Sequence, residues 1–389
     1  MACHCYDFNC CPDRHNTSCR KYDQCKENFG RDDVLPMGIA DADYRSPPEV
    51  LEAIKEYMDL GVLGYCFRSS HNVEILQNWV KKMYHFETKP EWYSYSPGIV
   101  PAVSVALAAL FPKGSKVMLH TPCYSPFLEV LQNNGYEVVR SPMVETEKGY
   151  TFNWDEMDTL LAECKSMILC NPHNPTGTKF TREELRRVAD LAEKHDILVM
   201  SDEIHADFIY DGRHCSYASV SDYALNNSIV FMAPSKTFNV AGLTTSYIII
   251  ANKEIKEKFD FQSECVHVWP NSIGLLANEI CYTKCDEWYV KQMEHLKANR
   301  DFLVAGINKE CAPITVKCPS ATFLLWLDCR NLGVPVEELT DLFSKHGLGL
   351  AGGDHYDGPG FMRLNYATSR ANCEKALECI KAAVASLKK

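Results

Sequence analysis

Residues 229–243 read Ile-Val-Phe-Met-Ala-Pro-Ser-Lys-Thr-Phe-Asn-Val-Ala-Gly-Leu. The first five residues are apolar and predict a buried strand, which presents Ser235 and Lys236 where it ends. A lysine held there can form a Schiff base with a carbonyl compound, and burial lowers its pKa. A surface lysine without chemistry is the more common explanation of such a residue, so the neighbouring strands must decide between the two.

The middle of the chain alternates apolar runs with amphipathic segments. Continuous apolar strands separated by helices of ten or more residues are typical of a parallel sheet that is covered on both faces. The sequence therefore predicts an α/β protein, and ligands of such sheets bind at the carboxyl ends of the strands. We expect strands at 116–120, 136–140, 165–170, 197–201, 228–233 and 246–251, with helices at 124–134 and 182–195.

Polar groups follow three of these strands directly. Asn174 lies in the segment after the strand that ends at Cys170, Asp202 follows the strand that ends at Ser201, and Lys236 follows the strand at 228–233. A pyridoxal phosphate site requires this combination of groups at one edge of a sheet. The carboxylate keeps the ring nitrogen protonated, the amide donates to the phenolic oxygen, and the lysine binds the cofactor covalently.

Composition and charge exclude several other classes of protein. The chain has 46% hydrophobic and 23% charged residues, and its formal charge of −11 argues against a nucleic-acid partner, whose binding face would be basic. No apolar run is long enough to cross a bilayer, and residues 1–5 lack the pattern of a signal peptide. We therefore expect a cytoplasmic protein with a small-molecule substrate and no membrane partner.

The 19 cysteines are scattered over predicted strands and helices, which favours reduced thiols used as small apolar side chains. A cluster near the N-terminus could bind a metal, but it lacks the paired spacing of a zinc site, so we predict no metal. The cluster consists of Cys3, His4, Cys5, Cys10, Cys11, Cys19 and Cys25.

A chain of 389 residues exceeds what a single core usually serves, so we expect more than one domain. Residues 1–47 predict an N-terminal arm that also contributes to a small domain. Residues 48–290 predict the large domain, and residues 291–389 a smaller α+β domain. Residues 1–35 read as an extended arm, and Ser46 with Glu49 has the spacing of a helix start.

Three motifs together resemble the class I/II aminotransferase superfamily of pyridoxal-phosphate enzymes, known as fold type I. They are NPHNPTG at 171–177, SDEIHAD at 201–207 and SKTFNVAGL at 235–243. Their forms are similar to the branch of cystathionine β-lyases and C–S lyases called the MalY/PatB group. The resemblance implies a mostly parallel seven-stranded sheet in the large domain, pyridoxal 5'-phosphate as cofactor and a homodimer.

The resemblance also implies roles for individual residues around the cofactor. Lys236 matches the lysine that binds it, and Asp202 the partner of its ring nitrogen. Asn174 matches the donor to the ring oxygen, and His205 takes a place where many aminotransferases have a tyrosine. Tyr124 matches the aromatic residue that stacks on the ring. The turn at Gly98 precedes a helix start, and this feature matches the phosphate site, formed by Gly98, Ile99, Val100 and Ser235.

On the substrate side, Arg363 matches the arginine that binds the α-carboxylate, and the backbone of Ala40 passes the same group. Tyr65 matches a tyrosine contributed by the neighbouring subunit. Together with Lys236, Tyr65 and Tyr124 are the candidate catalytic residues. Purely structural roles remain as alternatives for several candidate residues. Asp202 could be a helix cap, Tyr124 and His205 could be packing residues, and Arg363 could belong to a structural ion pair.

The sequence departs from the pattern of the family at three places. Thr244 stands where aminotransferases usually have a phosphate-binding arginine, which is consistent with the lyase branch. Gly38 and Ala42 stand where that branch usually has tryptophan and methionine. Both changes remove bulk, so we expect a widened or reshaped substrate pocket.

The resemblance implies α,β-elimination from cystathionine, cystine or similar S-substituted cysteines, which yields a thiol, pyruvate and ammonia. An aminotransferase uses the same cofactor residues and is the nearest alternative. A regulatory protein that merely keeps the scaffold is a remote one, because the cofactor residues are all present.

Overall fold

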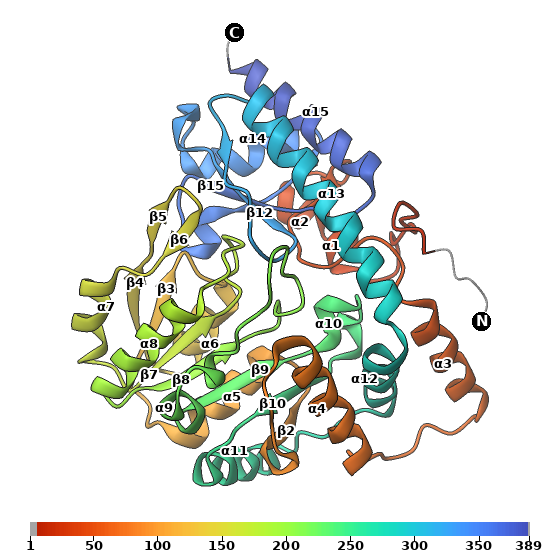
Figure 1. Ribbon diagram of the computed structural model, residues 1–389. Coiled ribbons are helices and arrows are strands. Elements are labelled where there is room, and N and C mark those ends of the chain that lie inside the picture. The colour runs from red at the N-terminus through yellow and green to blue at the C-terminus, as the bar shows by residue number, and fades with distance from the viewer. Residues whose placement is uncertain (1–5, 388–389) are drawn as a thin grey trace.

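The structure is a computed structural model that describes residues 6–387. A large sheet with its covering helices fills the lower part of the molecule in Figure 1, and the C-terminal elements, in blue, lie above it. None of the helices in these residues combines the length and the apolarity needed to cross a membrane.

The large sheet has seven strands in the order β2-β10-β9-β8-β7-β3-β4. Strand β10 runs antiparallel to both of its neighbours, and the other pairings are parallel, as expected from the sequence. The strands are β2 (Tyr93–Ser96), β3 (Lys116–Thr121), β4 (Glu137–Pro142), β7 (Ser166–Cys170), β8 (Leu198–Asp202), β9 (Ser228–Met232) and β10 (Ser246–Ile249).

Successive residues of these strands enter different cores because side chains alternate across a sheet. Val117 and Leu119 pack beneath one helical layer, whereas Met118 between them packs beneath the other. The first layer contains α5 (Ile99–Leu110), α6 (Ser125–Asn133) and α11 (Lys253–Cys265), and the second α7 (Trp154–Leu161), α8 (Arg182–Lys194) and α9 (Asp222–Asn226). The start of α8 is fixed by its own sequence, because Thr181 and Glu184 form a reciprocal capping box there.

Further helices close the end of this sheet, and a short hairpin projects from it. The helices are α3 (Pro48–Asp59), α4 (Ser70–Tyr84), α10 (Pro234–Thr237) and α12 (Ser272–Lys284), and the hairpin strands are β5 (Val144–Thr146) and β6 (Gly149–Thr151).

The C-terminal part has its own four-stranded sheet in the order β11-β12-β15-β14. Helix α13 continues from Asp286 to Glu310, so the predicted boundary at residue 290 falls within a helix, and the division into domains stays a prediction. The remaining elements are β11 (Thr315–Val316), β12 (Leu324–Asp328), α14 (Leu339–Lys345), β13 (Leu348–Gly349), β14 (Ala351–Gly352), β15 (Phe361–Asn365) and α15 (Arg370–Ser386).

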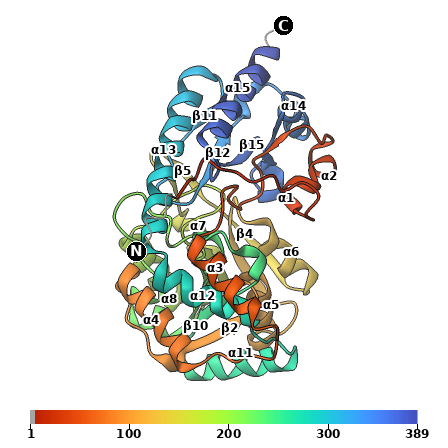
Figure 2. The same cartoon turned by 90° about the vertical axis from the view of Figure 1, so that its right-hand side faces the viewer.

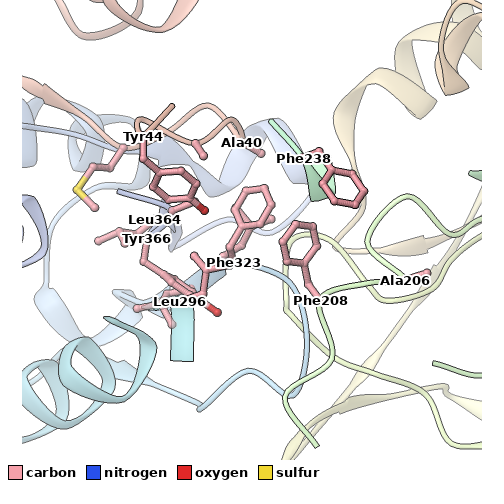
Figure 3. Close-up of a cluster of buried hydrophobic side chains, with 14 of the residues drawn as sticks. Ala40, Tyr44, Ala206, Phe208, Phe238, Leu296, Phe323, Leu364 and Tyr366 are labelled. Carbon is pink, nitrogen blue, oxygen red and sulfur yellow. The ribbon is translucent and has the colours of Figure 1, made fainter. Parts of the chain in front are cut away.

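One apolar cluster joins the two parts of the molecule and the N-terminal segment. In Figure 3, Phe208 and Phe238 from the large sheet's loops face Phe323 from the segment before β12. The rings of Phe208 and Phe323 meet edge to face with centroids 4.8 Å apart. Ala40 and Tyr44 of the N-terminal segment belong to the same cluster. The two parts therefore share a continuous core.

The sequence predicted an extended N-terminal arm, but the arm is not extended throughout. It contains two short helices, α1 (Arg20–Asp23) and α2 (Cys25–Phe29), and then β1 (Leu35–Pro36), which pairs in parallel with β13. Figure 2 shows α1 and α2 in red beside the blue elements α14 and β15.

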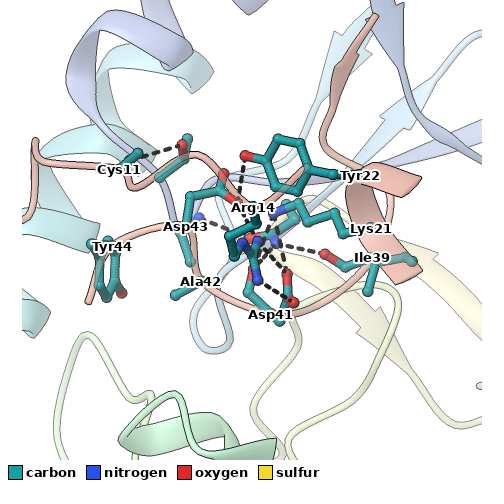
Figure 4. A network of polar contacts seen from close by, with 12 residues as sticks. Cys11, Arg14, Lys21, Tyr22, Ile39, Asp41, Ala42, Asp43 and Tyr44 are labelled. Carbon is teal, nitrogen blue, oxygen red and sulfur yellow. Dashed lines mark hydrogen bonds and ion pairs between the residues drawn. The ribbon is translucent and has the colours of Figure 1, made fainter. Parts of the chain in front are cut away.

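A buried ionic network anchors this arm (Figure 4). Lys21 is only 2% exposed, and its Nζ donates to Asp43 Oδ1 at 2.8 Å. The same oxygen accepts from Arg14 at 2.8 Å and from the hydroxyl of Tyr22 at 3.0 Å. A charge as buried as Asp43 requires such partners, because an unpaired ion in this place would be strongly destabilising.

The predicted start of α3 holds, but the expected capping residue is wrong. Pro47 occupies the N-cap position, and no described side chain caps this helix. The hydroxyl of Ser46 instead donates to the carbonyl oxygen of Asn239 at 2.7 Å. Ser46 therefore bonds to a residue that is distant in sequence instead of capping α3.

Candidate active site

A pocket of about 390 Å³ opens at the carboxyl ends of the central strands. We call it the active-site pocket. It brings together almost every residue that the sequence analysis selected: Ala40, Gly98, Ile99, Val100, Tyr124, Asn174, Asp202, His205, Ser235, Lys236, Thr244 and Arg363 all line it. Tyr65 does not line it within the same chain.

Lys236 lies on α10, the short helix after β9. Its pKa is lowered to about 8, mainly because the amine is buried; Arg363 acts in the same direction, and Asp41 and Asp202 oppose it. Nζ donates to the carbonyl oxygen of Ala40 at 2.7 Å, which directs the amine toward the N-terminal segment. The amine is thus held inside the pocket with a pKa that allows it to exchange protons near neutral pH.

Asp202 ends β8 and is 4% exposed. Its Oδ1 accepts from the backbone N–H of Ile204 at 3.1 Å, and its Oδ2 has only a weak contact of 3.9 Å with the Cys170 thiol. Burial raises the pKa of this carboxyl group to about 7, although the Ile204 N–H and Lys236 act against it. A buried carboxylate with an open oxygen is suited to a cationic N–H partner.

Asn174 and Arg363 form a pair across the pocket. Arg363, on β15, donates from Nη1 to Asn174 Oδ1 at 2.9 Å and from Nη2 to the carbonyl oxygen of Gly38 at 2.7 Å. Its guanidinium also stacks over the ring of Tyr356 at 4.6 Å. These contacts leave the amide NH2 group of Asn174 and the buried Nε of Arg363 without a hydrogen-bond partner among the described residues.

His205 and Tyr124 both line the active-site pocket. Burial lowers the pKa of His205 to about 3, so the ring is neutral, and its Nδ1 is buried without a hydrogen-bond partner among the described residues. Burial raises the pKa of Tyr124 to about 12. Both side chains are therefore neutral at physiological pH, and His205 has an unused ring nitrogen.

The residues that line the pocket include a helix start and several hydroxyl side chains. Helix α5 begins at Ile99 after Gly98, and no described side chain caps it. The first N–H groups of a helix and its positive end attract an anion. Ser235, Thr244 and Thr245 line the same pocket. The pocket therefore offers donors for a phosphate group without an arginine at position 244.

Several residues in and near the pocket were not selected from the sequence, among them Arg20, Tyr356 and Asp207. Arg20 and Tyr356 line the pocket, but the first comes from the irregular arm and the second from a 3-10 turn, and neither follows a periodic pattern. Asp207 lies behind the pocket and accepts from the hydroxyl of Thr237 at 2.6 Å. Trp79 and Tyr84 also donate to Asp207. Its position within the SDEIHAD motif could have marked it, since a third acidic residue there must find partners if it is buried.

Gly38 and Ala42, the two positions with unexpectedly small residues, lie in different surroundings. Gly38 lines a second chamber beside the active-site pocket, and a side chain there would start 3.1 Å from the backbone nitrogen of Ala351. Ala42 is 4% exposed and lines neither cavity, because its backbone is bonded to the side chain of Asn239. Only Gly38 can shape the space near a ligand directly.

Tyr65 is fully exposed and lies in a stretch with several other exposed apolar side chains. These are Met58, Leu60, Val62, Leu63 and Phe67, and Trp269 is also exposed. A group of exposed apolar side chains of this kind is typical of a surface that another molecule covers.

No metal site accompanies the pocket in the part of the chain that the structure describes. Cys3, His4 and Cys5 of the N-terminal cluster lie outside residues 6–387. Within those residues, no group of three or more histidine, cysteine, aspartate or glutamate side chains is arranged to hold a metal ion.

The fold and the site define a known class. The profile of the family described as aminotransferase class I and II matches residues 32–380, so the chain belongs to this family. Cystathionine beta-lyase PatB of Bacillus subtilis is 34% identical over 379 residues, which cover 96% of this chain and 98% of PatB.

Two solved structures agree with this assignment. One is cystalysin from Treponema denticola, whose crystal structure contains a pyridoxal 5'-phosphate cofactor. It has a TM-score of 0.94 at 29% identity, and the match covers 98% of this chain and 99% of the cystalysin chain. The PLP-bound C–S lyase from Staphylococcus hominis has a TM-score of 0.90 at 29% identity, with 97% of this chain and 98% of that chain covered. The family and fold predicted from the three motifs are confirmed.

Proposed function

We propose that the protein is a pyridoxal-phosphate-dependent C–S β-lyase that cleaves cystathionine, cystine or similar S-substituted L-cysteines. The products are a thiol, pyruvate and ammonia. The observation that carries this proposal is the convergence of Lys236, Asp202 and Arg363 on one buried pocket in a chain that is similar to a cystathionine β-lyase over nearly its full length.

The residues present fit the cofactor. The open oxygen of Asp202 suits a protonated ring nitrogen, and the amino group of Asn174 and the free nitrogen of His205 suit a ring oxygen. The start of α5 with Ser235 suits a phosphate, and the amine of Lys236 suits an aldehyde. When bound, pyridoxal phosphate withdraws electrons from the substrate's Cα.

The chain's own residues then have separate tasks. Arg363 holds the substrate α-carboxylate through its guanidinium, beside the backbone of Gly38 and Ala40. Lys236 removes the proton from Cα, the electron pair of that bond moves toward Cβ, and the C–S bond breaks to release the thiolate. Water then converts the remaining fragment to pyruvate and ammonia. Tyr124 and Tyr65 are the candidates to steer or protonate the leaving sulfur.

The active form that we propose is a cytoplasmic homodimer. The exposed apolar surface around Tyr65 supports it, since covering these side chains by a second copy would remove them from water and carry Tyr65 toward the neighbouring pocket. The cysteines of residues 6–387 are all free thiols, which is consistent with a reducing compartment.

The test is to incubate the purified holoenzyme with L-cystathionine and no keto acid. The proposal expects pyruvate and free thiol in equal amounts, and no products with a Lys236→Ala control. Transfer of the amino group to an added keto acid without thiol release would instead identify an aminotransferase. No turnover of either kind by the cofactor-loaded protein would favour a role without chemistry.

A further inference from the structure

A second chamber of about 330 Å³ adjoins the active-site pocket. The two cavities have five lining residues in common: Arg20, Ile39, Ser125, Tyr356 and Arg363. A substrate held at Arg363 by its α-carboxylate therefore lies at the border of both cavities. The chamber is large enough for the remainder of a side chain that extends away from the reacting carbon.

The arm places a free cation at this border. Lys21 and Tyr22, the two residues after Arg20, are fixed to Asp43 in the network of Figure 4. Arg20 takes no part in that network. Within residues 6–387, its guanidinium has no hydrogen bond or ion pair, although it lines both cavities. The helix that carries Arg20 is therefore held in place by Lys21 and Tyr22, whereas the guanidinium of Arg20 has no bonded partner among the described residues.

An anion from another element lines the same chamber. Glu129 on α6 is exposed, and no ion pair or hydrogen bond engages its carboxylate in the described part of the chain. Arg20 and Glu129 do not pair with each other, since no contact within 4.0 Å joins them. Phe29, Ile39 and Leu350 add apolar surface to the walls. Asn28, Thr340 and His355 also line the chamber.

We propose that this chamber binds the leaving thiol, with Arg20 recognising a carboxylate and Glu129 an ammonium group on it. The preferred substrates are then those that release a thiol which is itself an amino acid. Two free charges of opposite sign match a zwitterion, and the apolar walls match the methylene groups between it and the sulfur. This inference rests on the proposed lyase function.

Four cysteine conjugates that differ only in the distal charges test the inference. They are L-cystathionine, S-(3-carboxypropyl)-L-cysteine without the distal ammonium group, S-(3-aminopropyl)-L-cysteine without the distal carboxylate, and neutral S-butyl-L-cysteine. Pyruvate release by the holoenzyme gives kcat and KM for each conjugate. The variants are Arg20→Gln and Glu129→Gln, and Arg31→Gln serves as the control because Arg31 lies on the same arm without lining the chamber.

Arg20→Gln is expected to lower kcat/KM about 10- to 100-fold for the two conjugates with a distal carboxylate. The loss should lie in KM, because a remote group is bound equally in the ground state and the transition state. S-butyl-L-cysteine and the aminopropyl conjugate should keep their values. Glu129→Gln should act in the same way on the two conjugates with a distal ammonium group.

Equal losses on all four conjugates, or no loss on any, would overturn the inference while leaving the lyase function intact. If the wild-type holoenzyme formed no pyruvate from any of the four, the proposed function itself would fall and this inference with it.

Discussion

The active-site pocket has two sides that are built in different ways. On the cofactor side, three neighbouring strands of one sheet supply the polar groups: Asn174 follows β7, Asp202 ends β8 and Lys236 follows β9. On the substrate side, Arg363 comes from the C-terminal sheet, whereas Gly38 and Arg20 come from the N-terminal arm. The first side is one rigid edge, and the second is an assembly of segments that are far apart in sequence.

This difference has energetic consequences. The cofactor side is held by the ladder of a buried parallel sheet, so its polar groups stay in place without a ligand. The substrate side depends on a few polar contacts, such as those of Arg363 with Asn174 and Gly38, and on the ionic network of the arm. Changes on the cofactor side should therefore affect the chemistry, and changes on the substrate side should affect binding and selectivity.

The largest effect is expected from Lys236→Ala. Loss of the amine removes both the covalent attachment of the cofactor and the group that moves the Cα proton, so kcat should fall by about 10⁴-fold or more. Pyruvate release measures this, and reduction of the holoenzyme with borohydride followed by mass analysis should show no cofactor on the chain. Lys116→Ala, at a surface strand end, should retain full activity; loss in both variants would contradict the assignment.

Arg363→Lys tests the substrate side. The planar fork that can hold a carboxylate with two hydrogen bonds is lost while the charge remains, so kcat/KM should fall by about 10²-fold with the cofactor still bound. Kinetics with L-cystathionine and the absorbance of the bound cofactor separate the two effects. Arg140→Lys on the surface is the control. Release of the cofactor from the Arg363 variant would show that the two sides are not independent.

Lys21→Met tests whether the buried network holds the arm. Asp43 loses one of its partners in a buried site, and the attachment of the arm should weaken by about 3 kcal/mol. Hydrogen exchange of the Leu35 and Met37 amides, which are bonded to Gly347 and Gly349, measures this directly. KM for cystathionine should rise severalfold with kcat nearly unchanged. Lys26→Met, on the exposed side of α2, should alter neither quantity.

The smallest effect is expected in the pH dependence of cofactor attachment. The neutral amine attacks the aldehyde, and the pKa of Lys236 is lowered to about 8 by its burial. After removal and readdition of pyridoxal phosphate, the attachment rate should therefore rise about fivefold from pH 7 to pH 8 and then level off. An ordinary lysine would give a rate that rises about tenfold with each pH unit up to pH 10. Such a steady rise would show that the amine is not held in the apolar site described above.

The same contrast explains how far the site could be predicted from the sequence. The cofactor side could be predicted because each polar residue comes after a continuous apolar run, and the ends of parallel strands must meet at one edge of the sheet. Arg363 was found only through the resemblance to a family. Arg20 and Tyr356 were missed, since their segments carry no periodic pattern and reach the pocket through tertiary contacts.

Two further expectations, one from local spacing and one from the resemblance, also failed for a physical reason. Ser46 has the spacing of a capping residue, yet its hydroxyl is taken by Asn239 from a segment almost two hundred positions away. Ala42 was expected near the substrate, but its backbone is bonded to the side chain of the same asparagine, and it lies in the core. At both positions the contacts are decided by Asn239, a tertiary partner that lies far outside any local window of sequence.

The pairing of β1 with β13 has a consequence for how the protein is made. Leu35 reaches the ribosome's exit long before its partner Leu348, and the side chain of Asn365 must emerge before it can bond to Ile39. The strands of the cofactor side are complete by residue 249, well before these partners exist. During synthesis the pairing of β1 with β13 and the bond from Asn365 to Ile39 therefore cannot form until about the last tenth of the chain is being added, and the enzyme acquires its cofactor edge before its substrate side is complete.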